Sequence, residues 1–439
     1  GCGNNNRFVG RLWSGSAWTT CGVLTGGSAD GPFRSQVMCA SPREQSAVVA
    51  GIDKDGEFAI ARRRHDEAFA IASSAWEFAK DLKPVISDTG FSGVACAYEH
   101  ASGRALVFGG DSDNYAKAYK SDRGQALSST AVAFNTDVPT DRAVHLDAAA
   151  FIGSNVVLIA GAYHTPQAGS VGAYAHVWRN GIMTTRQQRL VSGEPLGAGQ
   201  ESAVAAVCDS YAPTARRCFA LTAVSSSSAA VRTWVYHVAQ NSFTTAADVA
   251  PSSPRSSPEP IGLRVAEWRG ELCVAVRTAN HDVWAARRGA DGVWSVPQYL
   301  DGVDLTAAST RHARHDVAMS TATGVCTVAV AKQSSGALVY DNVRGTAAFV
   351  RSALGGALHP TNGDGAVQAL QLRADPSPNV DTLMVLANVG DALFGATRDD
   401  ANAQWSTATV EGSLQRHAQT IRPYAFDFSR HLNYPTHAP

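Results

Sequence analysis

No hydrophobic run in the 439-residue sequence approaches the ~20 residues that a membrane-spanning helix needs. Only 17% of the residues are charged, the formal net charge is −1, and no basic stripe alternates with aromatic residues. The sequence also has no Gly-x-Ser-x-Gly elbow, no Walker loop and no His-Glu-x-x-His motif. We therefore expect no nucleic-acid partner and no cofactor, and no short motif marks a catalytic centre.

Helical periodicity is almost absent, and a repeat takes its place. The stretch ELCVAVRTANHDVWAARRGADGVWSVP (271–297) consists of an alternating run, a polar turn, a second alternating run and a Gly-x-Trp. Related units occur at 57–79, 104–129, 156–186, 217–246, 325–352 and 382–411. Each alternates with a period of two residues, which is typical of half-buried strands, and each follows another extended run.

Four strands per unit at this spacing predict an all-β protein, a β-propeller of four-stranded blades. The segment 6–24 matches the second half of a unit, and 419–435 matches the first half. If the two join as one blade, the ring closes by its N- and C-terminal strands and has eight blades; the alternative is seven. The tryptophans recur at equivalent places, which favours packing between blades. The single propeller domain would have its blades at 6–24 plus 419–435, 46–87, 92–135, 146–190, 201–250, 261–302, 315–355 and 364–412.

One blade carries a resemblance to a known class. In VAVRTANHDVWAARRGADGVWSVPQYLDG (274–302), an apolar strand, a polar turn ending in Asp, an aromatic strand start and Gly-x-Trp follow one another. This order resembles the blades of propeller lectins, including fucose-binding and tectonin-like ones, and the segment 382–411 shares it. The resemblance implies that the polar turns hold sugar hydroxyls. The Asp-box of sialidase propellers, Ser-x-Asp-x-Gly-x-x-Trp, does not occur.

A first set of candidate ligand-binding residues lies where the chain enters the first strand of several blades. If the repeat aligns as proposed, these side chains surround one mouth of the central channel, where they would bind an anion or a sugar. The alternative is that they cap their strands or hydrogen-bond to the neighbouring blade. The set comprises His145, Asp147, Glu201, His312, His315 and Asp316. We expect no metal at this ring.

A second set lies in the polar turns between the second and third strands. His65 and Asp66 occupy one such turn, and His281 and Asp282 occupy another. These are the positions at which a propeller lectin would contact sugar hydroxyls. In the alternative interpretation, each aspartate accepts a hydrogen bond from its own backbone two residues further on.

The eight cysteines indicate an oxidising compartment. Cys208 and Cys218 flank a loop between two extended runs, so their sulfurs would face each other across a hairpin. Cys21 and Cys39 bracket a Gly/Ser-rich loop in the same manner. We therefore expect a secreted or cell-surface protein; the alternative is that these residues are buried free thiols.

The remaining cysteines permit less. Cys273 and Cys326 occupy matching places in neighbouring units, as core residues or as a third bridge, and Cys96 has no evident partner. The start GCGNNN resembles the end of a bacterial lipobox, which makes Cys2 a candidate lipid anchor for membrane tethering; the alternative is an ordinary cysteine.

Together these features favour a binding or adhesion protein that recognises a glycan or a protein partner at a cell surface. Two alternatives remain. A glycan-processing hydrolase or lyase would place two carboxylates in the channel mouth. A structural subunit of a surface assembly would instead carry apolar patches on its rim.

Overall fold

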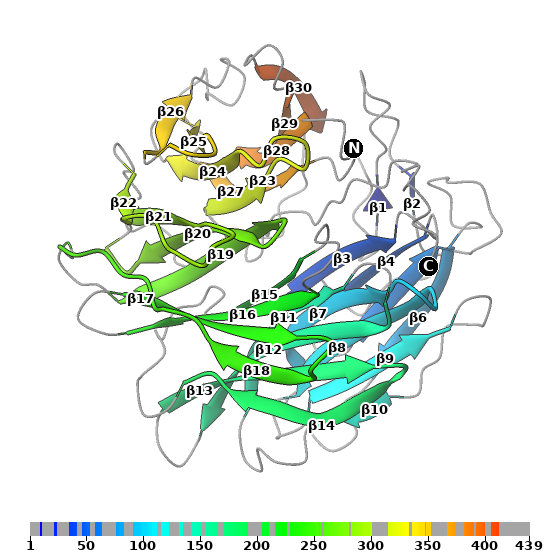
Figure 1. The fold of residues 1–439 in the computed structure, drawn as a ribbon. Helices are drawn as coiled ribbons and strands as arrows, with labels where there is room; N and C mark the ends of the chain where they lie inside the picture. Colours follow the sequence, from blue (N-terminus) through cyan, green and yellow to red (C-terminus); the bar gives the residue numbers. More distant parts are fainter. Residues whose placement is uncertain are drawn as a thin grey trace.

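The structure is a computed structural model, and in its described part every named element is a β-strand (Figure 1). None of the described residues forms a helix long and apolar enough to cross a membrane. The described residues are 9–10, 22–23, 35–41, 46–52, 58–63, 76–82, 91–111, 116–122, 131–134, 142–151, 154–165, 170–191, 204–209, 216–225, 229–253, 255, 259–280, 282–300, 315–332, 336–346, 348–352, 367–374, 382–389, 392–399 and 405–411.

Within these residues the strands form seven four-stranded antiparallel sheets, each a meander in chain order. Sheet 1 contains β3 (Ser35–Ser41), β4 (Ser46–Ile52), β5 (Phe58–Arg63) and β6 (Trp76–Leu82). Sheet 2 contains β7 (Phe91–Glu99), β8 (Arg104–Asp111), β9 (Ala116–Ser121) and β10 (Ala131–Phe134). Sheet 3 contains β11 (Arg142–Ala150), β12 (Val156–Thr165), β13 (Ser170–Arg179) and β14 (Ile182–Arg189). Sheet 4 contains β15 (Val204–Cys208), β16 (Arg217–Val224), β17 (Ala230–His237) and β18 (Ser242–Thr245).

The last three sheets repeat the plan. Sheet 5 contains β19 (Pro260–Trp268), β20 (Glu271–Thr278), β21 (Val283–Arg288) and β22 (Gln298–Tyr299). Sheet 6 contains β23 (His315–Met319), β24 (Cys326–Lys332), β25 (Gly336–Asn342) and β26 (Val350–Ser352). Sheet 7 contains β27 (Val367–Ala374), β28 (Thr382–Val389), β29 (Ala392–Asp399) and β30 (Trp405–Glu411). Two short strands, β1 (Val9–Gly10) and β2 (Gly22–Val23), pair with each other.

The first strand of each sheet packs beside the first strand of the next, from β3 through to β27. The buried apolar residues accordingly form clusters between consecutive sheets rather than one central core. Because the middle strands face a neighbouring sheet on both sides, strands such as β20 and β21 are buried along their whole length. Radially packed four-stranded meanders define a β-propeller, so the predicted all-β propeller class is confirmed.

Sheet 1 differs from the blade expected at 46–87, because it begins at Ser35. The apolar run SAVVAGI, expected to be the first strand, is the second strand β4 and is buried throughout. A strand that is buried on both faces is typical of a middle position, which is the physical reason for the shift. The composite blade of 6–24 with 419–435 cannot be followed, since 419–435 lies outside the described residues.

Tryptophan side chains fill the space between sheets, as their repetition predicts. Trp178 and Trp284 are fully buried, and each belongs to a cluster that also contains residues of the preceding sheet. Trp234 of sheet 4 donates its indole N–H to the Leu190 carbonyl at the end of sheet 3, at 3.1 Å. The aromatic rings supply the large buried areas that hold consecutive sheets together.

Candidate functional site

Two carboxylates of the predicted entry ring hold neighbouring sheets together. Asp147 of β11 accepts hydrogen bonds from its neighbour Ala148 N–H and, at 2.9 Å, from Ala206 N–H in β15. Asp316 of β23 repeats this geometry, with an oxygen 2.9 Å from Leu372 N–H in β27. In both cases the carboxylate satisfies a backbone donor on the first strand of the next sheet. The structure thus places these two side chains in an interblade role, the alternative weighed from the sequence.

His315 is fully buried beside Asp316, so it does not offer its ring to a ligand at an open channel mouth. Its Nε2 lies 3.4 Å from the Ala275 carbonyl oxygen of sheet 5. Burial first, and then the positive charges of Arg264 and Arg277, hold the pKa of His315 well below its usual value. A neutral imidazole in this position serves packing between sheets 5 and 6.

The other entry-ring and turn candidates are not brought together by the described residues. His145 lies in β11, next to a register shift, and its side chain is outside the described part. The remaining candidates that lie outside the described residues are Glu201, His312, His65, Asp66 and His281. Their contact with a ligand stays a prediction.

Asp282 is the predicted turn residue around which the structure shows a polar cluster. Its backbone carbonyl accepts the Thr278 N–H at 2.9 Å, which closes the turn between β20 and β21. Its carboxylate lies 3.2 Å from Arg255 Nη1, and both side chains are partly open to solvent. The aspartate is therefore displayed by a rigid turn rather than consumed in turn formation.

Tyr299 of β22 completes this cluster, which we call the Asp282 cluster (Arg255, Asp282 and Tyr299). The guanidinium carbon of Arg255 is 4.6 Å from the centre of the Tyr299 ring. The Arg255 backbone N–H also donates to the Tyr299 hydroxyl oxygen at 3.2 Å. Arg255 belongs to the segment that connects sheets 4 and 5, and the Glu259 carbonyl of that segment accepts the Ala279 N–H at 2.8 Å. These contacts fix the connecting segment against the turn.

The chemistry of the Asp282 cluster suits a polar, uncharged ligand. A guanidinium supplies only donors and a carboxylate only acceptors, so the pair can hold two adjacent hydroxyl groups. The half-buried tyrosine adds a flat apolar surface with a polar tip. Among the described residues, no three His, Cys, Asp or Glu side chains gather as a metal site requires.

Three disulfides appear in the described part of the chain. One joins Cys208 to Cys218, the directly opposed pair of β15 and β16. Cys39 is bonded to Cys96, so its predicted pairing with Cys21 is wrong; Cys21 itself lies outside the described residues. The physical reason is that β3 and β7 are adjacent first strands, which brings Cys39 to Cys96 across the boundary between sheets 1 and 2.

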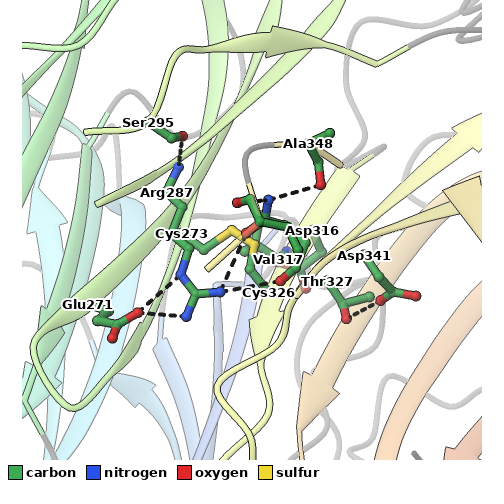
Figure 2. The surroundings of a disulfide bond; sticks show 12 residues. Glu271, Cys273, Arg287, Ser295, Asp316, Val317, Cys326, Thr327, Asp341 and Ala348 are labelled. Carbon is green, nitrogen blue, oxygen red and sulfur yellow. Dashed lines mark hydrogen bonds and ion pairs between the residues drawn. A yellow bond between two sulfur atoms is a disulfide. The ribbon is translucent and has the colours of Figure 1, made fainter. Parts of the chain in front are cut away.

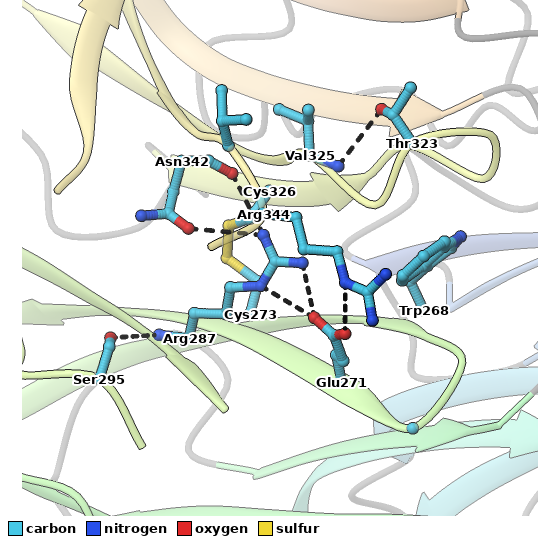
Figure 3. Close-up of polar contacts among 12 residues, drawn as sticks. Trp268, Glu271, Cys273, Arg287, Ser295, Thr323, Val325, Cys326, Asn342 and Arg344 are labelled. Atoms are coloured by element: carbon cyan, nitrogen blue, oxygen red, sulfur yellow. Dashed lines mark hydrogen bonds and ion pairs between the residues drawn. A yellow bond between two sulfur atoms is a disulfide. The ribbon is translucent and has the colours of Figure 1, made fainter. Parts of the chain in front are cut away.

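The third disulfide, Cys273–Cys326, joins β20 to β24 and therefore sheet 5 to sheet 6 (Figure 2). A buried ion-pair network lies beside it (Figure 3). Glu271 accepts hydrogen bonds from Arg287 of its own sheet and, at 2.9 Å, from Arg344 of sheet 6. Arg287 also donates to the Asn342 carbonyl at 3.3 Å.

This network was not singled out in the sequence. Glu271 is the first residue of a strand and Arg287 the fifth of another, and neither belongs to a local motif. Similar charged contacts recur between sheets 6 and 7, where Arg398 pairs with Asp341 at 2.5 Å. A charged residue recurring near the end of the third strand (Arg62, Arg287 and Arg398) is the signal that would have revealed it.

A pocket of about 320 Å³ lies at the outer edge of sheet 6. Val343, Thr346, Val350 and Arg351 are among its lining residues, and its walls are mainly apolar. It is separate from the Asp282 cluster, whose turn connects the second and third strands of sheet 5.

The sequence matches no protein-family model and no curated protein. Three solved structures are similar in fold. The BP39L lectin of Burkholderia pseudomallei aligns with a TM-score of 0.52 at 12% identity, covering 86% of this chain and 99% of the lectin. The SapL1 lectin, solved with α-methyl fucoside, gives 0.39 at 15% identity, covering 74% and 97%. The six-bladed lectin of Aleuria aurantia gives 0.39 at 11% identity, covering 72% and 93%.

The likeness to the BP39L lectin extends over almost all of that protein. It establishes that this chain has the β-propeller fold seen in that lectin, in agreement with the resemblance of its blades to propeller lectins.

Proposed function

We propose that this chain is a glycan-binding protein that acts outside the cytoplasm, at a cell surface or in an extracellular assembly. The observation that carries the proposal is the Asp282 cluster. It combines a carboxylate, a guanidinium and a tyrosine ring on the turn at which the blade resembles those of propeller lectins.

Two further observations support this proposal. The fold is that of a protein described as a lectin. Three disulfides suit an oxidising compartment, because thiols in the cytosol are kept reduced. Asp147 and Asp316, the described carboxylates of the entry ring, accept hydrogen bonds across the boundaries between sheets, which favours the binding role over acid/base catalysis there.

The test is exposure of the purified chain to a broad panel of immobilised glycans, scoring both retention and released product. We expect retention without product, and at least a tenfold loss of affinity for D282N and for Y299A. An exposed ion pair without an aromatic partner, Arg232–Asp248, provides the matched control, and D248N should bind as the unchanged chain does. Release of a cleaved product, or equal loss in D248N, would contradict the proposal.

A further inference from the structure

The exposed apolar residues of the chain are concentrated at one place. Of five large hydrophobic side chains that are strongly exposed among the described residues, four belong to sheets 5 and 6. Val293 and Val296 lie in the connection between β21 and β22; Val343 and Val350 flank the connection between β25 and β26. The fifth, Ile182, lies on sheet 3.

These two connections are neighbours. The Gln298 side chain forms a reciprocal pair of hydrogen bonds with the Phe349 backbone, donating to the carbonyl at 3.1 Å and accepting from the N–H at 2.8 Å. β22 and β26 accordingly lie side by side in Figure 1. The four valines therefore border one boundary between blades, which we call the 5/6 rim (residues 289–298 and 343–351).

The 5/6 rim combines a projection with a hollow. Val296, 78% exposed, projects from the sheet 5 side. The pocket of about 320 Å³ opens on the sheet 6 side, between Val343 and Val350. Exposed apolar groups gathered around a pocket are typical of interaction sites, whereas isolated ones are not.

Charge is arranged in the same complementary way. Asp291 is exposed on the sheet 5 side, and Arg351 is exposed on the sheet 6 side. A two-fold axis through the rim would bring the sheet 5 side of one molecule against the sheet 6 side of another. Val296 would then face the pocket of the partner copy and Asp291 would face its Arg351, twice over.

From this self-complementarity we propose that the 5/6 rim is a two-fold interface with a second copy of this chain, in which Val296 of each copy fills the pocket of the other. Two-fold contacts of this kind are the commonest form of oligomer. Asp282 precedes β21 and the rim connection follows it, so the Asp282 cluster stays open in such a dimer. The inference does not depend on glycan binding.

The test is sedimentation velocity of the full chain over a range of concentrations. We expect a reversible dimer, and at least a tenfold higher dissociation constant for V296D. Because Val296 is exposed, this variant should fold normally, as circular dichroism would check. I182D, which adds the same charge at a comparably exposed residue of sheet 3, should dimerise as the unchanged chain does.

A double-mutant cycle tests the pairing of charges. D291N and R351Q should each weaken the dimer, and the double variant should be no weaker than either single one. A chain that remains monomeric up to about 100 µM, beyond which a contact is worth under ~6 kcal/mol, would overturn the proposal. So would a V296D variant that dimerises normally, an I182D variant that is equally impaired, or additive effects in the cycle.

Discussion

At the scale of the residue, single carboxylates connect neighbouring blades. The first strand of a propeller blade has one edge without a strand partner, so its backbone donors need other acceptors. Asp147 and Asp316 provide them from the preceding sheet. Glu99 does comparable work for sheet 3, accepting from the Trp178 indole N–H at 2.8 Å and from the Gly181 backbone N–H at 2.7 Å.

Replacing Asp316 should separate the carboxylate's charge from its role as an acceptor. D316A leaves the buried Leu372 N–H without its acceptor, which should lower the free energy of unfolding by about 1–3 kcal/mol. D316N keeps an acceptor oxygen and should lose less. Urea unfolding of both variants gives the comparison. Equal stability of D316A and the unchanged chain would contradict the interblade role.

Buried histidines should make the fold sensitive to acid. Burial lowers the pKa of His176 to about 4, whereas the unfolded chain has the ordinary value of about 6.5. Below pH 6.5 the unfolded state therefore binds a proton that the folded state does not, and stability falls by about 3 kcal/mol as the pH approaches 4. Above pH 6.5 this contribution is constant, and His315 acts in the same direction.

The measurement is the urea midpoint of the unchanged chain, H176Q and H237Q at pH 7.5 and pH 5. We expect H176Q to lose part of the acid sensitivity, because it removes one buried titrating group. H237Q replaces a partly exposed histidine and should respond as the unchanged chain does. Full acid sensitivity in H176Q would show that His176 is not a source of it.

At the scale of the element, the strands are easier to predict than their partners. Period-two alternation identifies β20 and β21 from the sequence alone, because each side chain of a strand meets a defined face. It does not distinguish a first strand from a second, which is why SAVVAGI was assigned to the wrong position in sheet 1. Partners across blades, such as Cys39 with Cys96 or Glu271 with Arg344, depend on how sheets pack and leave no local pattern.

The candidate site divides in the same way. The turn that carries Asp282 was visible as a polar break between two alternating runs. Arg255 and Tyr299 were not, because they come from a connecting segment and from the fourth strand, and only packing brings them to the turn. Asp316 looked like a ligand-binding residue because a carboxylate at a strand entry has the same sequence pattern in both roles.

The disulfides should differ in their effect on stability. Cys273–Cys326 spans 53 residues and Cys208–Cys218 spans 10. In the chain-entropy model the longer loop stabilises by about 4 kcal/mol and the shorter by about 3 kcal/mol. We expect C273A/C326A to unfold at lower urea than C208A/C218A. The reverse order would show that linking sheet 5 to sheet 6 adds nothing beyond the packing already present.

At the scale of the whole molecule, the propeller is a set of sheets whose cores lie between them. Each boundary is closed by a different combination of tryptophans, carboxylates, ion pairs and disulfides, so the repeat is conserved in shape while its chemistry varies from blade to blade. This leaves turns free to differ. The turn at Asp282 displays its polar groups, and the connections of the 5/6 rim display apolar ones.

The most direct test of the account is a crystal structure of the chain grown with the glycan that it retains most strongly. We predict a sugar ring in contact with Tyr299, with hydroxyl groups within hydrogen-bond distance of the Asp282 carboxylate and the Arg255 guanidinium. Sugar density only at other surfaces, or a chain that retains no glycan from the panel, would contradict the central claim.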